Sequence, residues 1–311
     1  MPVMSRRFIT FVLLAATSCS PSSSTSSENT TDPPGKDVLT PFPIDRGDDG
    51  SQTPGTYKGL PLRLTDNGSP AVTPVDGVIG LVCIGMSNGV RECSDFRERV
   101  RAQYASEINP QVRVANCAVG GNAIERWIEP PYDADLWDRC ISAVLPQAGI
   151  RVDQVRVIWH KAADQFTTGP GNTGLPTYPS AGSDYENFLD HLGKFAARVK
   201  TKFPAVQAVY TSSRSYGGFA NSISRGEPLS YEEGHALNTW LASNSRVAGV
   251  WYGWAAYLWA PSCASGVTNK SNACYAREDF VEDGVHPSDL GTAKISAMLH
   301  TRFLRETWYH R

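Results

Sequence analysis

Three short segments of this chain contain the residue types that carry out acyl transfer, although they lie far apart in the sequence. Ser87 stands in the run Gly-Met-Ser-Asn-Gly after an apolar stretch, which predicts a tight turn with an exposed hydroxyl near backbone N–H groups. The glycine pair Gly120-Gly121 follows a second apolar stretch and lets the backbone approach a ligand closely. Asp283 and His286 are spaced so that the carboxylate can hydrogen-bond one imidazole nitrogen and leave the other for a hydroxyl group.

Each segment also has a plain structural interpretation. A serine in a turn is more often structural than nucleophilic, paired glycines often form only a loop, and a single histidine is more often packed than reactive. The three segments occur together in one chain, with the serine turn near the start of the α/β region and the Asp-x-x-His unit near its end. This combination favours a nucleophilic serine assisted by an Asp–His pair.

The rest of the chain predicts the framework that would bring these segments together. Short β-branched runs alternate with helical patterns from residue 76 onward, which favours one three-layer α/β domain with a mostly parallel sheet covered on both faces. Ligands bind such sheets outside the carboxyl ends of the strands, where the three segments fall. The strands are expected at 77–84, 112–116, 155–159, 205–210 and 247–252, and the helices at 96–104 (capped by Ser94), 136–145, 184–202, 231–242 and 292–306.

The three segments resemble motif blocks of the SGNH (GDSL-like) hydrolases, and within them the carbohydrate acetylesterases related to sialate O-acetylesterase. Gly85-Met-Ser-Asn88 resembles the Gly-Gln-Ser-Asn block of that branch, with Met86 in place of Gln. Ala118–Trp127 resembles its Ala-Val-Gly-Gly-Thr-x-Ile-x-x-Trp block, and Asp283–His286 matches its Asp-x-x-His block. The blocks follow the family order across residues 80–291. The resemblance implies the SGNH hydrolase fold, a flavodoxin-like sandwich with five strands, and ester hydrolysis without a cofactor.

The resemblance also implies a role for each site residue. Ser87 would be the nucleophile, His286 the general base and Asp283 the residue that orients His286, while the backbone N–H groups of Ser87 and Gly121 would form the oxyanion hole. These roles are hypotheses that follow from the family, and Ser87→Ala tests them.

The third family block is where this chain departs from the pattern. The family has Trp-x-Gln-Gly-Glu, whereas this chain has Trp159-His-Lys-Ala-Ala163, so that Lys161 replaces the Gln. An alanine side chain cannot donate a hydrogen bond to an oxyanion, and losing one such donor costs roughly 10²–10³ in turnover. Lys161, Asn122 or backbone groups alone are the alternatives for this donor. His160 is a further candidate for lining the site.

The most favoured function is an exported serine esterase that removes acetyl or short acyl groups from carbohydrate esters, with an acylated carbohydrate or another small ester as its partner. A general short-chain esterase or lipase, and a catalytically weak SGNH domain that binds surface glycans, remain alternatives.

A net charge of −2 without a large basic cluster argues against nucleic-acid binding. No Cys/His cluster has zinc spacing, so neither a metal nor another cofactor is expected. The aromatic residues at 251–259 are expected in the core rather than on a sugar-stacking wall, and His191 is expected to face solvent.

The N-terminal segment has the pattern of an export signal. Arg6 and Arg7 precede a nine-residue apolar stretch, which predicts a signal peptide over residues 1–18. Ala16-Thr-Ser-Cys19 resembles a bacterial lipobox, so Cys19 is either the lipidated residue or part of an ordinary secreted chain. Residues 19–57 are rich in Ser, Thr and Pro and predict a disordered linker, which leaves 58–311 for the hydrolase domain. The expected location is the bacterial cell envelope, with membrane contact only through a lipidated N-terminus.

Six further cysteines agree with export, because an even number in an exported chain predicts up to three disulfides. Cys263 and Cys274 are predicted to pair, since both lie in a loop rich in Gly, Ser and Asn. Pairing of the other neighbours, Cys83 with Cys93 and Cys117 with Cys140, would close the shortest loops, but other connectivities remain open.

Overall fold

The computed structural model describes residues 56–57, 60–61, 64–161, 163–165, 168–169, 173–176, 178, 180–227, 229–260, 262–265 and 273–311. The predicted signal peptide, Cys19 and nearly all of the predicted linker lie outside the described residues. Among the described residues, no helix combines the length and the apolar character needed to cross a membrane.

A six-stranded sheet forms the centre of the fold, with the order β4-β3-β5-β8-β10-β9. Its first five members run parallel, and in chain order they are arranged 2-1-3-4-5, as in flavodoxin-like sheets. The predicted mostly parallel sheet is therefore confirmed. The sixth strand, β9, was not predicted, because it has only two residues and pairs antiparallel with β10 at the edge. The strands are β3 (Ile79–Ile84), β4 (Val112–Asn116), β5 (Val155–Lys161), β8 (Ala208–Ser212), β9 (Arg246–Val247) and β10 (Val250–Trp254).

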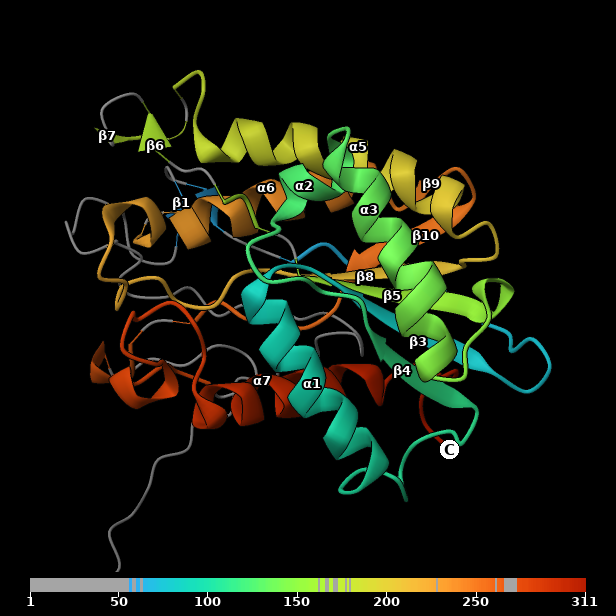
Figure 1. Ribbon diagram of the computed structural model, residues 1–311. Coiled ribbons are helices and arrows are strands. Elements are labelled where there is room, and N and C mark those ends of the chain that lie inside the picture. Colours follow the sequence, from blue (N-terminus) through green and yellow to red (C-terminus); the bar gives the residue numbers. More distant parts are fainter. Residues whose placement is uncertain are drawn as a thin grey trace, which may run out of the picture. The chain divides into compact units, whose positions relative to one another are not determined.

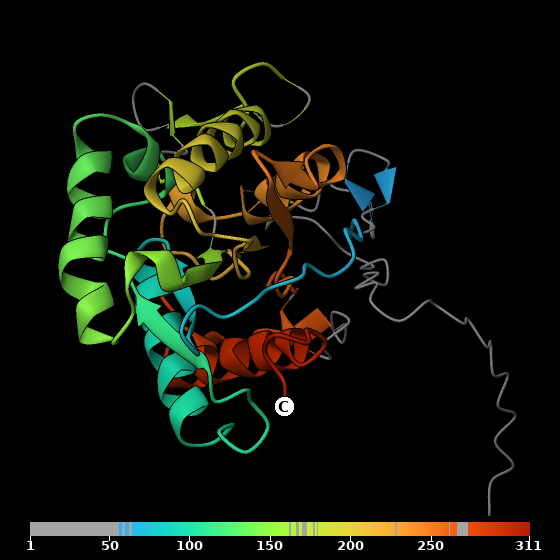
Figure 2. The same cartoon turned by 90° about the vertical axis from the view of Figure 1, so that its right-hand side faces the viewer.

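Helices cover both faces of the sheet, which gives the three predicted layers (Figures 1 and 2). Every residue of β3, β8 and β10 is buried, as expected for parallel strands enclosed on both sides. One face carries α1 (Ser87–Arg101) and α7 (Asp289–Phe303). The other carries α2 (Ile124–Ile128), α3 (Tyr132–Arg139), α5 (Asp184–Lys202) and α6 (Leu229–Ser243).

The remaining elements are short. The pairs β1 (Thr56–Tyr57) with β2 (Leu60–Pro61) and β6 (Thr168–Gly169) with β7 (Thr173–Gly174) form two separate small sheets. A π-helical turn (Cys140–Val144) continues α3 into the three-residue α4 (Leu145–Gln147). Single 3₁₀ turns lie at Val152–Gln154, Ile223–Arg225, Cys263–Ser265 and Arg277–Asp279.

The first helix begins earlier than the sequence predicts. Ser94 was expected to cap it, but α1 starts at Ser87, and Ser94 lies inside the helix. The Ser94 hydroxyl instead accepts a hydrogen bond of 2.9 Å from the side chain of Asn116, the last residue of β4. The longer helix places Ser87 in its first turn, where backbone N–H groups have no partner within the helix.

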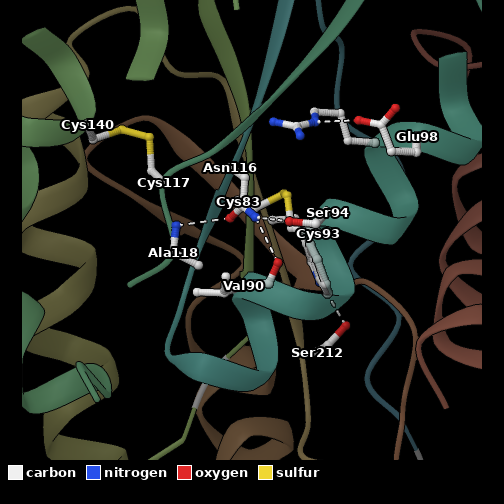
Figure 3. The surroundings of a disulfide bond; sticks show 12 residues. Cys83, Val90, Cys93, Ser94, Glu98, Asn116, Cys117, Ala118, Cys140 and Ser212 are labelled. Atoms are coloured by element: carbon white, nitrogen blue, oxygen red, sulfur yellow. Dashed lines mark hydrogen bonds and ion pairs between the residues drawn. A yellow bond between two sulfur atoms is a disulfide. The ribbon is translucent and has the colours of Figure 1, made fainter. Parts of the chain in front are cut away.

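Three disulfides connect sequence neighbours. The predicted Cys263–Cys274 bond is present. Of the pairings that the sequence left open, the structure has Cys83 with Cys93 and Cys117 with Cys140. Figure 3 shows the last two on either side of Asn116. The Cys83–Cys93 bond joins β3 to α1, and the Cys117–Cys140 bond joins the residue after β4 to the end of α3. Both therefore fix segments that lead into the predicted site.

Candidate active site

The three sequence segments meet at one cavity of about 200 Å³ at the carboxyl ends of the parallel strands. Its lining residues follow four of the five parallel strands or precede α7. They are Met86, Ser87 and Asn88 after β3, Gly121 after β4, Asp164 and Gln165 after β5, Arg214 and Arg225 after β8, and Val285 and His286 before α7.

Ser87, His286 and Asp283 form a continuous hydrogen-bonded chain beside this cavity. The Ser87 Oγ lies 2.7 Å from His286 Nε2, across 199 residues of sequence. The other ring nitrogen, Nδ1, is hydrogen-bonded to Oδ2 of Asp283. With the ring proton on Nδ1 and directed at the carboxylate, Nε2 is available to accept the Ser87 hydroxyl proton. The arrangement is therefore competent for general-base activation of a serine nucleophile.

The turn from Asp283 to His286 holds the carboxylate in its charged form. Its Oδ1 accepts hydrogen bonds from the backbone N–H groups of Val285 (2.9 Å) and His286 (3.0 Å). Burial by itself raises the pKa of Asp283, but these hydrogen bonds and the His286 ring outweigh it and lower the pKa to about 2. Gly284 makes the turn possible, because its φ is +69° and a Cβ there would lie 1.7 Å from the carbonyl oxygen of Phe219.

Helix α1 holds the His286 loop from the other side. Asn88 donates a side-chain hydrogen bond of 3.0 Å to the carbonyl oxygen of Val285. Arg91 donates one of 3.1 Å to the carbonyl oxygen of Pro287. Asn88 directly follows the proposed nucleophile, so the same helical turn carries Ser87 and fixes the residues beside His286. The sequence contained this residue within the first block but did not reveal its contact with the loop.

The backbone groups predicted for the oxyanion hole border the cavity. Ser87 is the first residue of α1, a helix of 15 residues, so its N–H points out of a positive helix end. Gly121 has a φ of +72°, and the space beside its Cα is open. Both residues line the cavity that contains the Ser87 hydroxyl. A developing negative charge beside Ser87 would therefore meet a favourable field.

The structure does not place Lys161 in the cavity, which corrects its assignment as an alternative oxyanion donor. Its ammonium group pairs with the carboxylate of Glu92 in α1, and the two side chains are 3% and 0% exposed. The sequence prediction ended the strand at Trp159, but β5 continues to Lys161. Side chains alternate along a strand, so Trp159 and Lys161 point to the α1 face and His160 points to the opposite face. Burial lowers the pKa of Lys161 and raises that of Glu92.

Two other expectations about the cavity are also corrected. His160 does not line it; its ring is buried and stacks on Phe195, with ring centroids 3.9 Å apart. Asn122 does not direct its amide into the cavity, because Nδ2 donates a hydrogen bond of 2.8 Å to the carbonyl oxygen of Gly120. The aromatic residues of the 251–259 segment are buried in the core, as predicted.

Sequence reasoning missed the polar residues that follow β5. Asp164 lines the cavity, and its Oδ1 lies 2.7 Å from His191 Nδ1. His191 therefore does not simply face solvent as predicted. Burial alone would lower the pKa of His191, but the hydrogen bond to Asp164 and its charge raise it. The position of Asp164 directly beyond a buried strand end is the signal that could have indicated it.

Gln165 is the second missed residue. Its backbone N–H donates a hydrogen bond of 2.8 Å to Glu125, which fixes the chain beside the cavity. Its side-chain Oε1 is buried and has no hydrogen-bond partner among the described residues. Gln165 is thus a cavity-lining residue whose side-chain oxygen is buried and unpaired within the described part of the chain.

Comparison with known proteins gives distant structural matches. No family model matches the chain, and no curated protein matches it. An inferred acylhydrolase from Bacteroides fragilis NCTC 9343 matches with 12% identity and a TM-score of 0.44 over 76% of this chain and 91% of that chain. An inferred GDSL-like lipase from Parabacteroides merdae ATCC 43184 matches with 13% identity and a TM-score of 0.42 over 75% and 98%.

An acetylxylan esterase from Geobacillus stearothermophilus, solved as a catalytic mutant, matches with 14% identity and a TM-score of 0.42 over 76% of this chain and 98% of that chain. At these identities and TM-scores the matches carry no argument about this chain, and the chemistry of the site follows from its own geometry.

Proposed function

We propose that this protein is a serine esterase that hydrolyses acetyl or other short acyl esters of carbohydrates through an acyl-enzyme. The observation that carries the proposal is the hydrogen-bonded chain Ser87–His286–Asp283 at the edge of a cavity. A serine, an imidazole and a carboxylate in this order constitute the machinery of a serine hydrolase.

In the first half-reaction, Ser87 Oγ attacks the ester carbonyl carbon while His286 Nε2 takes the hydroxyl proton. The N–H groups of Ser87 and Gly121 stabilise the resulting oxyanion. The tetrahedral intermediate collapses, His286 returns the proton to the departing sugar oxygen, and the acyl group stays on Ser87. In the second half-reaction, His286 takes a proton from water, the hydroxide attacks the acyl carbon, and Ser87 leaves with the proton.

Gln165 is the side-chain donor that we infer in place of the missing third-block residue. Lys161 is committed to Glu92 and Asn122 to Gly120, whereas Gln165 lines the cavity. An amide N–H directed at the oxyanion would add the third donor that the Ala162-Ala163 pair cannot supply.

The lining of the cavity favours a carbohydrate ester. Seven of its ten lining residues carry polar or charged side chains, which suit a hydroxyl-rich sugar better than a long acyl chain. This favours a carbohydrate esterase over a lipase. The three disulfides support an exported protein, because such bonds persist in oxidising compartments.

The deciding experiment compares the purified protein with its Ser87→Ala variant on 4-nitrophenyl acetate and on an acetylated methyl glycoside. We expect hydrolysis that is lost in Ser87→Ala and retained in Ser142→Ala, a matched control at an exposed serine. A fluorophosphonate probe should label the wild-type protein on Ser87. Equal turnover in the wild type and in Ser87→Ala would refute the proposal. A folded wild type that neither turns over nor labels, but binds the glycoside, would instead support a glycan-binding domain.

A further inference from the structure

The two backbone donors of the proposed oxyanion hole belong to different elements of the fold. Ser87 is the first residue of α1, whereas Gly121 lies in the loop that follows β4. An oxyanion is stabilised only by donors that are already in place when its charge develops. The proposed reaction therefore depends on the contacts that hold the start of α1 and this loop together.

The backbone fixes one side of this arrangement. The N–H of Val119 donates a hydrogen bond of 3.0 Å to the carbonyl oxygen of Gly85, the residue after β3. The N–H of Asn122 donates one of 3.2 Å to the carbonyl oxygen of Val119. The second bond closes a turn in which Gly121, with a φ of +72°, is the third residue. These bonds position Gly121 relative to the end of β3.

Asn116, the last residue of β4, connects the same loop to α1. Its Nδ2 donates hydrogen bonds to the carbonyl oxygen of Val90 (2.8 Å) and to the hydroxyl group of Ser94 (2.9 Å), both in α1. Its Oδ1 accepts the backbone N–H of Ala118 at 3.2 Å. Figure 3 shows these hydrogen bonds meeting at one side chain between two disulfides. A single amide group thus uses both of its polar atoms to join α1 to the loop that contains Gly121.

The two segments also pack closely where the donors lie. A Cβ on Gly89, in the first turn of α1, would lie 3.6 Å from the Cβ of Ala118. A Cβ on Gly120 would lie 4.0 Å from the Cβ of Ser87. A shift of α1 against the loop would therefore change the position of the Ser87 N–H relative to the N–H of the loop.

We propose that Asn116 is a positioning residue for the oxyanion hole, because it fixes the N–H groups of Ser87 and Gly121 relative to each other. This inference rests on the proposed esterase function and specifies how its transition state is held. Asn116 does not line the cavity, so it acts through the backbone of α1 and of the loop rather than by touching the substrate. A misplacement of about 1 Å can lower turnover roughly 10²-fold.

The test compares Asn116→Ala with Asn109→Ala, a closely matched control. Asn109 precedes β4, at the other end of the strand, and makes the same kinds of contact. Its Nδ2 donates to the carbonyl oxygen of Trp308 at 3.1 Å, and its Oδ1 accepts the backbone N–H of Gln111 at 3.0 Å. Both variants should be destabilised to a similar extent in urea unfolding. We expect only Asn116→Ala to lower kcat for 4-nitrophenyl acetate, roughly 10–100-fold and with little change in KM.

A transition-state analogue distinguishes positioning from a loss of folded protein. The boron of methylboronic acid accepts an electron pair from Ser87 Oγ while the hydroxyl proton passes to His286, and the tetrahedral boronate places an oxygen where the oxyanion forms. We expect the Ki of this acid to rise in Asn116→Ala by about the factor by which kcat falls, and to stay unchanged in Asn109→Ala. Ser94→Ala, which removes one of the hydrogen bonds of Asn116, should give a smaller change in both constants. A smaller folded fraction would lower kcat and leave Ki as it is.

The failure of this inference and the failure of the proposed reaction give different results. If Asn116→Ala keeps the wild-type kcat and Ki, or loses kcat while Ki stays constant, the positioning role is overturned and the reaction at Ser87 is not. If the folded wild type neither hydrolyses the ester nor binds methylboronic acid, as measured by calorimetry, both proposals are overturned.

Discussion

Lys161 and Glu92 form an ion pair that is buried between the end of β5 and helix α1. Glu92 lies in the second turn of the helix that begins with Ser87, so the pair fastens this helix to the central sheet. The close approach is visible at Gly85, where a Cβ would lie 3.2 Å from the carbonyl oxygen of Lys161. Lys161, which stands where the resembled motif block has a glutamine, thus stabilises the position of the helix that begins with Ser87.

Lys161→Met should therefore lower the stability of the protein. It leaves the Glu92 carboxylate buried without its counter-charge, which costs about 3–5 kcal/mol in the free energy of unfolding. The double variant Lys161→Met/Glu92→Leu removes both charges and should recover most of this loss. Urea unfolding of the single and double variants measures the effect. A single variant that keeps its stability but loses kcat would show instead that Lys161 acts in the reaction.

Asp283→Asn should abolish most of the activity while the fold persists. The variant loses the charge that supports a protonated His286, and removing an orienting carboxylate of this kind lowers turnover roughly 10⁴-fold. The pKa of Asp283 is about 2, so the group stays ionised at all pH values where the enzyme would be assayed. We therefore expect kcat/KM to be lowered in both mildly acidic and mildly alkaline buffer. Asp190→Asn, at an exposed ion pair, is the control. A loss confined to acidic buffer would contradict this role.

Much of the fold could be predicted because local pattern and burial agree. The buried run that forms β3 and the amphipathic stretch that forms α5 can be predicted from the local sequence alone. Helix α5 was predicted with its observed bounds, Asp184–Lys202. The two-residue β9 carries no such pattern, because its pairing depends only on the neighbouring β10. The start of α1 was missed because Ser94 resembles a helix cap. The first turn of α1 is instead held by tertiary contacts of Ser87 and Asn88 with the His286 loop, which local sequence does not reveal.

The candidate site divides in the same way. Asp283 and His286 could be found because their residue types and short spacing are themselves the signal, and Ser87 because it stands in a Gly-Met-Ser-Asn-Gly turn after an apolar stretch. Arg214 could not be found, because its place in the same cavity as Ser87 depends on the tertiary fold of the segment after β8. The direction of Lys161 was missed for a smaller reason. Two additional residues in β5 decide which face of the sheet it points to.

Gln165→Ala should lower kcat with little change in KM. If its amide stabilises the oxyanion, the contact strengthens as charge develops, and its loss costs roughly 10²–10³ in kcat. Asn122→Ala, which removes an amide bonded to its own loop, should have a much smaller effect. Steady-state kinetics on 4-nitrophenyl acetate provides both constants. An equal, small effect of both substitutions would leave the oxyanion hole with backbone donors alone and would refute the role of Gln165.

His160 should make stability depend on pH. Its buried ring stacks on Phe195, and burial lowers its pKa from 6.5 to about 3. Its Nδ1 has no hydrogen-bond partner among the described residues, so no acceptor there would stabilise the protonated, charged ring. The unfolded chain takes up that proton below about pH 6.5, whereas the folded protein does so only near pH 3. The contribution of His160 to stability is therefore complete above pH 6.5 and declines as the pH falls towards 3.

The corresponding variant is His160→Leu, which keeps an apolar side chain of similar volume against Phe195. One group with this shift changes the free energy of unfolding by roughly 1.4 kcal/mol per pH unit in that range. The loss of stability between about pH 7 and about pH 5 should therefore be about 2 kcal/mol smaller in His160→Leu than in the wild type. Urea unfolding at both pH values measures it, with His310→Leu near the chain end as the control. Parallel pH profiles for the wild type and His160→Leu would show that the folded protein already accommodates a charged ring at this position.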